Sequence, residues 1–330
     1  MAAIRTAGLR KEYGPVTALH DLDLTVEPGE AFGFLGPNGA GKSTTIDLLL
    51  GFATPTAGRA EVLGRDVAAA GGDCRRGVGV LPEGYSVFEG LSARDHLRSI
   101  CRLKGVDDDP DRLCDTVGLD AADRDRPAGG FSTGMRQRLV LATALAGDPD
   151  LLVLDEPSSG LDPTGITRLR EIVRAAVDDG TAVFFSSHHL AEVEAVCDRV
   201  GILNDGRLAA VDTVDGLRDR TGGAERLRIE LREEPDGSVL GRLRRVEGVV
   251  DVATDGREVT VGCRAAPTKA EAVAVAVESA TVEDFTVSGR SLEQLFDHYT
   301  GDESPTAGNG AGTAELGAVT ETAASRGESE

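Results

Sequence analysis

The sequence has few lysines and no basic cluster, and this shortage narrows the partners that the protein can bind. Only Lys11, Lys42, Lys104 and Lys269 occur, and 56 acidic residues outnumber 35 basic ones, for a net charge of −21. Because nucleic-acid binding relies on clustered lysine and arginine, we expect no nucleic-acid partner. Much acid with little lysine is typical of proteins adapted to concentrated salt, where screening permits such a charge. An ordinary acidic cytosolic protein is the alternative interpretation.

Paired cysteines and long apolar runs are also missing. The five cysteines are scattered and form no Cys-x-x-Cys pair. This pattern indicates neither a zinc site nor a disulfide framework, and it favours reduced, buried thiols. No run reaches the apolar length of a membrane span, and residues 1–14 contain no apolar signal core. We therefore expect a soluble, cytoplasmic chain that reaches a membrane only through a partner.

The most informative segment that is present is a glycine-rich loop at residues 36–44. It consists of Gly36, Pro37, Asn38, Gly39, Ala40, Gly41, Lys42, Ser43 and Thr44. It follows a predicted buried strand at 31–35 and precedes a predicted helix at 44–50, the context that a phosphate-binding loop needs. Glycines let backbone N–H groups surround a phosphate, and the helix N-terminus adds a favourable dipole. Lys42 can then reach the β- and γ-phosphates, and the Ser43 hydroxyl can bind magnesium. A chance Gly-rich turn is the alternative, disfavoured because strand, loop and helix agree.

A second signal is the apolar run 151–154 that ends in Asp155 and Glu156. Strand ends of an open parallel sheet face the ligand crevice. Asp155 can bind magnesium through water or a hydroxyl network, and Glu156 can act as the general base for an attacking water. A solvated acidic turn is the alternative interpretation of this pair.

A third signal is Ser132, which precedes the predicted helix 133–147 in the stretch Phe-Ser-Thr-Gly-Met-Arg-Gln-Arg. Serine at this position is a good N-cap. Its hydroxyl and the Gly134 N–H can equally hold a γ-phosphate at the helix N-terminus. The sequence alone favours the capping role.

Periodicity predicts an α/β fold with a mostly parallel sheet and helices on both faces. Residues 2–30 predict antiparallel strands, and 92–125 have a helical pattern interrupted near 107–110. Further strands are predicted at 58–66, 77–82, 181–186, 200–204 and 207–211, and further helices at 164–179 and 189–198. The chain is expected to divide into residues 1–220, a C-terminal domain at 221–300 with a linker near 221–223, and a disordered acidic tail at 301–330. Within 226–299 the order strand, helix, strand, strand, helix, strand, helix resembles a ferredoxin-like unit.

Across residues 2–220 the order of these motifs resembles the ATP-binding subunit of ABC transporters. That family carries a signature loop, usually Leu-Ser-Gly-Gly-Gln, between the phosphate loop and the Asp-Glu strand, and Ser132 and Gly134 are retained here. Thr133 and Met135 depart from the common pattern, but Ser-x-Gly-Met followed by Arg/Lys-Gln-Arg is found in an exporter-like (ABC-2 type) branch. The resemblance implies a RecA-like parallel core, an antiparallel β subdomain and a helical subdomain at about 85–130.

The resemblance assigns roles to four more residues. Tyr13 stands where the family stacks an aromatic ring on adenine, with ordinary packing as the alternative. Glu83 replaces the glutamine that contacts magnesium and water, which adds a charge at that position. Asp162, in Ser-Gly-Leu-Asp, belongs to a loop that crosses to the other subunit. His188 matches the histidine that senses the γ-phosphate.

The resemblance further implies that two subunits hold two ATP molecules head to tail, with Mg²⁺. Each site then combines the phosphate loop, Glu83, Asp155, Glu156 and His188 of one chain with the signature loop of the other. The helical subdomain is expected to grip a cytoplasmic helix of a separate membrane permease, and the branch points to efflux of a small molecule or ion. The C-terminal domain stabilises the dimer or has a regulatory role. A non-transport ABC ATPase and a degenerate ATP-binding scaffold are the competing hypotheses, and the cargo stays open.

Overall fold

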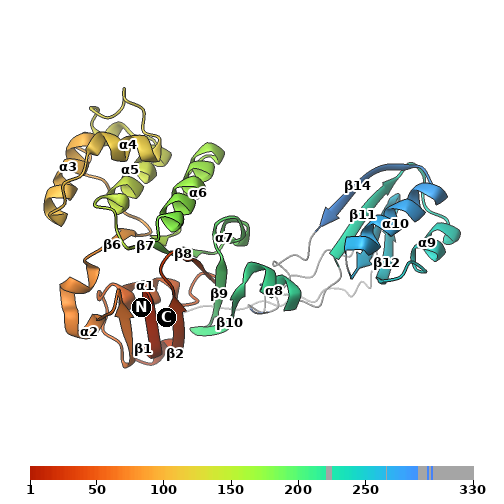
Figure 1. The fold of residues 1–330 in the computed structure, drawn as a ribbon, viewed down its shortest axis with the longest axis horizontal. Coiled ribbons are helices and arrows are strands. Elements are labelled where there is room, and N and C mark those ends of the chain that lie inside the picture. Colours follow the sequence, from red (N-terminus) through yellow and green to blue (C-terminus); the bar gives the residue numbers. More distant parts are fainter. Residues whose placement is uncertain (221–224, 265, 289–295, 297–298, 300–330) are drawn as a thin grey trace, which may run out of the picture.

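The computed structural model describes residues 1–220, 225–264, 266–288, 296 and 299 (Figure 1). A six-stranded sheet with the order β10-β9-β3-β8-β7-β6 forms the centre of the molecule's larger part. Five neighbouring strands run parallel and β10 pairs antiparallel with β9, so the prediction of a mostly parallel sheet is confirmed. The strands are β3 (Ala31–Leu35), β6 (Val78–Leu81), β7 (Leu151–Asp155), β8 (Ala182–Ser187), β9 (Arg199–Asn204) and β10 (Arg207–Thr213).

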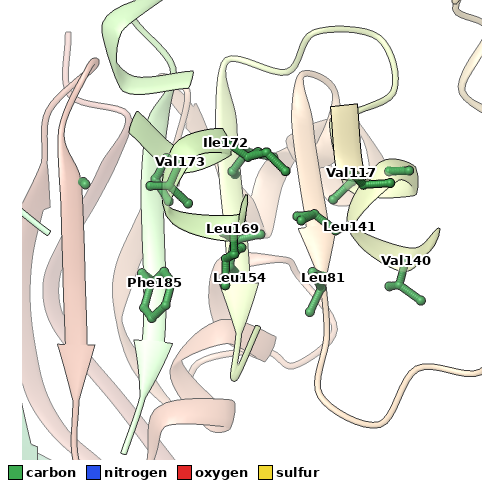
Figure 2. Close-up of a cluster of buried hydrophobic side chains, with 14 of the residues drawn as sticks. Leu81, Val117, Val140, Leu141, Leu154, Leu169, Ile172, Val173 and Phe185 are labelled. Carbon is green, nitrogen blue, oxygen red and sulfur yellow. The ribbon is translucent and has the colours of Figure 1, made fainter. Parts of the chain in front are cut away.

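Both faces of this sheet are buried, because the central strands are apolar at consecutive positions. Leu154 and Phe185 belong to a cluster on one face, shown in Figure 2, whereas Val153 and Phe184 belong to a second cluster on the other face. The first face is covered by α5 (Thr133–Leu145), α6 (Pro163–Asp178) and α7 (Leu190–Val196). The second face is covered by α1 (Lys42–Leu49), which begins directly after the glycine-rich loop.

A second sheet packs on the opposite side of α1. Its four strands are antiparallel in the order β2-β1-β4-β5, and their apolar residues share the second cluster with α1. The antiparallel pairing predicted for residues 2–30 is thereby confirmed. The strands are β1 (Ile4–Tyr13), β2 (Val16–Val26), β4 (Ala57–Val62) and β5 (Arg65–Asp66), and the short helix α2 (Val67–Ala70) and the 3-10 turn η1 (Gly71–Arg75) follow.

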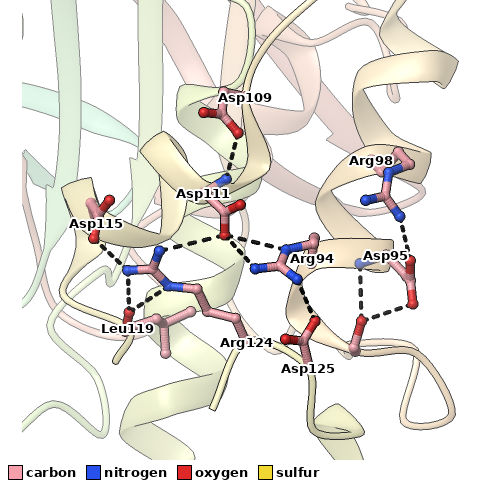
Figure 3. Close-up of polar contacts among 10 residues, drawn as sticks. Arg94, Asp95, Arg98, Asp109, Asp111, Asp115, Leu119, Arg124 and Asp125 are labelled. Atoms are coloured by element: carbon pink, nitrogen blue, oxygen red, sulfur yellow. Dashed lines mark hydrogen bonds and ion pairs between the residues drawn. The ribbon is translucent and has the colours of Figure 1, made fainter. Parts of the chain in front are cut away.

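The helices α3 (Ala93–Lys104) and α4 (Pro110–Val117) form a helical part beside α5. Helix α4 stops at Gly118, which adopts φ 72°, so the helical pattern predicted through residue 125 is wrong beyond 117. The turn after it is held by Arg124, which donates to the Leu119 carbonyl and pairs with Asp111 and Asp115 (Figure 3). These polar contacts, rather than helical hydrogen bonds, order residues 119–125. The short 3-10 turn η2 (Ala128–Gly130) then precedes α5.

A third sheet belongs to a separate unit with its own apolar cluster. Its four strands are antiparallel in the order β12-β13-β11-β14, with two helices inserted in the order β-α-β-β-α-β. This is the ferredoxin-like arrangement. The elements are β11 (Glu225–Leu231), α9 (Gly237–Leu243), β12 (Val249–Asp255), β13 (Glu258–Cys263), α10 (Ala266–Ser279) and β14 (Val282–Ser288).

One helix, α8 (Val214–Arg220), precedes this unit and was not predicted. The predicted linker at 221–223, most of the predicted last helix and the tail at 301–330 fall outside the described residues. Within the part of the chain that is described, no helix has the length and apolar character to cross a membrane.

Candidate functional site

The glycine-rich loop connects β3 to α1 and packs closely against neighbouring backbone. Gly39 and Gly41 adopt φ values of 85° and 107°, which residues with a side chain rarely adopt. A Cβ at Gly36 would stand 2.6 Å from the Leu203 carbonyl oxygen, and a Cβ at Gly41 would stand 2.7 Å from the Ala18 carbonyl oxygen. Glycine is therefore required both by the loop's own conformation and by the strands that support it.

Lys42, the first residue of α1, turns its side chain back over this loop. Its Nζ donates to the Gly36 carbonyl at 2.6 Å and to the Pro37 carbonyl at 3.3 Å, and it stands 3.8 Å from Glu156 Oε1. The side chain is buried. Burial lowers the pKa of the Lys42 ammonium, and the carboxylates of Glu156, Asp155 and Glu83 oppose that shift. The lysine is thus a buried cation beside a cluster of anions.

A cavity of about 360 Å³ opens above the loop. It is lined by the loop residues 37–39 and 41–44 together with Glu83, Asp155 and Glu156, all predicted site residues, and by Ala18, which was not predicted. The loop following β6 supplies Glu83, and the end of β7 supplies the two acids. The volume of this cavity is at the lower end of the range for ligand pockets. Its walls combine backbone N–H donors, one cation and several carboxylates.

Asp155 ends β7 with one oxygen unused. Its side chain is buried, and Oδ1 has no hydrogen-bond partner among the described residues. Burial raises the pKa of this carboxyl, and the nearby Glu83 and Glu156 raise it further. Asp155 lines the same cavity as Ser43 and Glu83, and its buried carboxylate with an unpartnered oxygen fits a hard cation such as Mg²⁺, which takes its other ligands from phosphate and water. Over the described ranges, no group of three or more His, Cys, Asp or Glu residues is arranged to hold a metal by itself.

Glu156 follows Asp155 in a left-handed backbone conformation, with φ 46°. Its N–H donates to the Ser186 carbonyl at 3.0 Å, which ties the turn to β8. Its Oε1 stands 2.9 Å from His188 Nδ1, and its Oε2 accepts from the Ser187 hydroxyl at 3.4 Å. The structure therefore brings Glu156 and His188 into direct contact, as a base and a histidine that orients it can do.

Glu192 was missed by the sequence reasoning. It stands in the first turn of α7 and accepts hydrogen bonds from the Ser158 hydroxyl at 2.5 Å and from the Ser187 hydroxyl at 3.1 Å. Its position four residues after His188 was the one available signal, but acidic residues are common in the first turn of a helix. The pattern carried no indication of a contact with the site.

The signature-loop residues occupy a different place in the same chain. Ser132 caps α5 by accepting from the Met135 N–H at 3.2 Å, which confirms the capping role. Asp162 caps α6 by accepting from the Gly165 N–H at 2.8 Å, and that bond, helped by Arg138, lowers the pKa of its carboxyl. These residues and Gly134 line a second cavity that shares no lining residue with the first. One chain therefore does not bring the signature loop to its own phosphate loop.

Tyr13 stands apart from both cavities. It ends β1 with 49% of its surface exposed, and Lys11 Nζ lies 4.7 Å from the centre of its ring. It lines neither the cavity above the phosphate loop nor the one at the signature loop. With about half of its surface exposed, Tyr13 is not a core residue, and its role at adenine stays a prediction.

Comparison with known proteins gives concordant matches. A family model described as ABC transporter matches residues 19–159. The daunorubicin/doxorubicin resistance ATP-binding protein DrrA of Streptomyces peucetius is 36% identical over 307 residues, covering 91% of this chain and 92% of that protein. The bacitracin transport ATP-binding protein BcrA of Bacillus licheniformis is 36% identical over 240 residues, covering 72% of this chain and 78% of that protein. The match to DrrA extends well beyond the cassette-like part of the chain.

Solved structures agree with this result. The structure of an ATP-binding subunit of an ABC transporter superposes with a TM-score of 0.62 at 30% identity, covering 67% of this chain and 93% of that one. The dimeric cassette MJ0796, in a post-hydrolysis state with ADP and Pi, superposes with a TM-score of 0.59 at 20% identity, covering 64% of this chain and 98% of that one. At that identity the second match establishes the fold alone.

Proposed function

We propose that this chain, which belongs to the ABC transporter family as one of its ATP-binding subunits, hydrolyses ATP to drive a separate membrane permease that exports a small molecule or ion.

 The relatives DrrA and BcrA are named for drug resistance and antibiotic transport, and this supports export as the direction. The observation that carries the proposal is the cavity in which Lys42, Asp155 and Glu156 meet at the end of the parallel strands. We place the chain on the cytoplasmic face of the membrane, attached through its permease.

Phosphoryl transfer requires positioning and charge stabilisation more than covalent chemistry. In this proposal the loop N–H groups and Lys42 bind the β- and γ-phosphates. Glu156 accepts a proton from the attacking water, and His188 orients the Glu156 carboxylate. Ser43, Asp155 and Glu83 would hold Mg²⁺, which neutralises developing negative charge when bound. The carboxylate of Glu83 in place of an amide strengthens the attraction for a divalent cation.

The second half of each site comes from another copy of the chain. Ser132, Gly134 and Asp162 line a cavity of their own, so a head-to-tail pair of chains would bring this cavity against the partner's phosphate loop. The Ser132 hydroxyl and the N-terminus of α5 then meet the γ-phosphate. ATP would hold the two chains together, and its hydrolysis would release them. Tyr13, exposed at the end of β1, is proposed to stack on the adenine ring.

The helical part and the C-terminal unit have separate proposed roles, coupling to the permease and support of the pair of chains. We propose that residues 85–130 grip a cytoplasmic helix of the permease, so that closure of the two cassettes drives alternating access. The unit at 221–300 is proposed to stabilise the pair of chains. It has its own apolar cluster, which is what an accessory domain requires.

The composite site has a direct test. Ser132→Arg blocks the signature half, and Lys42→Ala disables the phosphate loop, so each variant alone should have almost no ATPase activity. A mixture should regain up to roughly a quarter of wild-type activity, because random pairing forms mixed dimers about half the time and each mixed dimer has one intact site. No recovery in the mixture, from two variants that still pair with wild-type chains, would contradict the head-to-tail arrangement.

Coupling to a permease requires a separate experiment. Glu156→Gln should keep ATP binding and lose turnover, which traps the paired state. Tagged Glu156→Gln chains, purified with ATP at high salt from solubilised membranes of the host, should retain a polytopic membrane protein. Recovery of soluble partners alone would favour a non-transport ATPase, and rapid turnover by this variant would refute the role of Glu156.

A further inference from the structure

Glu192, on helix α7, connects two segments beside the general base, the turn after β7 and the end of β8. One of its oxygens, Oε2, accepts from Ser158, which follows the Asp-Glu strand, and from Ser187, which ends β8. Ser158 and Ser187 are both buried, with 8% and 0% of their surface exposed. The same Ser187 hydroxyl is 3.4 Å from Glu156 Oε2. A continuous polar chain therefore runs from Ser158 through Glu192 and Ser187 to the base.

The position of Glu192 is fixed by close packing of α7 on β3. A Cβ at Gly33 would stand 2.3 Å from Val193 Cγ1 and 3.2 Å from Cys197 Sγ, so only glycine permits this approach. Val193 is completely buried. Because Val193 adjoins Glu192, the packing of α7 fixes the backbone of Glu192. This places the Glu192 carboxylate near Ser158 and Ser187.

The single hydroxyl proton of Ser187 has two carboxylates within reach. The Ser187 hydroxyl has one proton to donate, and its oxygen already accepts from the His189 N–H at 3.0 Å. It can donate either to Glu192 at 3.1 Å or to Glu156 at 3.4 Å, but not fully to both. A base whose Oε2 accepts from Ser187 has fewer lone pairs directed at water. The nearer carboxylate of Glu192 therefore competes for the proton and leaves Glu156 available.

We propose that Glu192 is a positioning residue for ATP hydrolysis: it draws the Ser187 hydroxyl away from Glu156 and thereby leaves the oxygen of the base free to bind the attacking water. This inference rests on the function proposed above. Glu192 acts through Ser187 and touches no substrate. Ser158 shares the acceptor oxygen of Glu192, but its hydroxyl is not required for Ser187 to turn away from the base.

The test compares steady-state ATP hydrolysis by wild type and Glu192→Gln. The neutral amide is a weaker acceptor than the Glu156 carboxylate, so the Ser187 proton should shift to the base. We expect kcat to fall about tenfold, which is a part of the roughly 100- to 10,000-fold that general-base catalysis supplies, because the base itself stays in place. KM for ATP should stay within about twofold, because Lys42 and the phosphate loop are untouched. Glu171→Gln, which removes an exposed carboxylate on α6, is the control for the loss of one charge.

Two further variants separate this role from simple support of the fold. In Glu192→Gln/Ser187→Ala no hydroxyl remains to occupy the base, so kcat should recover at least about threefold over Glu192→Gln, a non-additive result. Ser158→Ala removes the other partner of Glu192 and should keep most of the wild-type kcat. If Glu192 only anchored the loop of Ser158, Ser158→Ala would reproduce the loss and Ser187→Ala would add to it.

The outcomes also distinguish this inference from the proposed function. If the wild-type chain hydrolyses no ATP under conditions in which it binds ATP and pairs, both fail. If wild type is active and Glu156→Gln is not, while Glu192→Gln keeps the wild-type kcat, only the role of Glu192 is overturned. An unchanged or lower kcat on adding Ser187→Ala to Glu192→Gln overturns it as well.

Discussion

His96 is the least expected polar residue in the apolar interior, and it yields a quantitative prediction. It lies on α3 with none of its surface exposed, and neither ring nitrogen has a hydrogen-bond partner among the described residues. The Phe88 ring packs beside it at 5.5 Å between ring centres. Burial lowers the pKa of the imidazole. The folded protein therefore keeps His96 neutral and leaves its N–H group unpaired.

Replacing His96 with leucine, which has a similar volume, should stabilise the helical part at neutral pH. An unpaired buried polar group costs about 1–3 kcal/mol, so we expect a gain of roughly 1–2 kcal/mol in the free energy of unfolding. The wild type should also be sensitive to acid. Because the folded pKa is lowered, only the unfolded chain takes up the proton as pH falls below the unfolded value of about 6.5. Stability is then complete above that pH and declines below it, by at most about 1.4 kcal/mol per pH unit.

The measurement is urea unfolding at fixed high salt between pH 5 and pH 8. The chain contains no tryptophan, so far-UV circular dichroism is combined with hydrogen exchange of peptides from α3. His96→Leu should flatten the decline below pH 6.5, whereas His20→Leu, in the antiparallel sheet, should leave it unchanged. Parallel curves for wild type and His96→Leu across this range, or a lower stability of His96→Leu at pH 8, would refute the reasoning.

Three other predictions concern the site and its support. Asp155→Asn should raise the free energy of unfolding at pH 7 by about 0.5–2 kcal/mol, because burial raises the pKa of Asp155 and so penalises its ionised form at that pH. The same variant should lower the affinity for magnesium at least about tenfold, measured by titration with MgATP. Gly33→Ala should destabilise by about 1–3 kcal/mol in urea unfolding through overlap with Val193, and Val193→Ala should partly restore the loss. Lys42→Ala should weaken ATP binding about 10- to 100-fold by calorimetry, since it removes charge-assisted hydrogen bonds, and an unchanged affinity would contradict the role of the loop.

The parts of the fold that depend on local sequence were predicted well. The strand at 31–35 and the helix after the phosphate loop are confirmed, because apolar runs and glycine spacing fix them within a few residues. The family resemblance is confirmed by the matches to known proteins. The helical pattern through residue 125 was wrong because Gly118 ends α4 and Arg124 then orders the turn through contacts with more distant residues.

Contacts between distant segments could not be predicted from the pattern. His188 and Glu156 were each predicted as site residues, but the sequence did not predict their contact at 2.9 Å, which joins residues 32 positions apart. In the sequence Glu192 is an ordinary acidic residue on a short helix. Only in the fold do β8 and the turn after β7 place two serines beside it. Sequence periodicity describes faces of elements, and such contacts arise only when the sheet brings several strand ends together.

The physical oddities of the site also identify it without reference to any motif. Glu156 has a left-handed backbone that costs about 1–2 kcal/mol for a residue with a side chain, Asp155 has a buried oxygen without a partner, and Lys42 is a buried ammonium. Each feature disfavours folding, and all three line one cavity. They persist because β3, β7 and β8 are buried on both faces and hold the turns rigidly. A chain selected for stability alone would place a glycine at 156 and neutral side chains at 42 and 155, so their presence together indicates chemistry on a charged ligand.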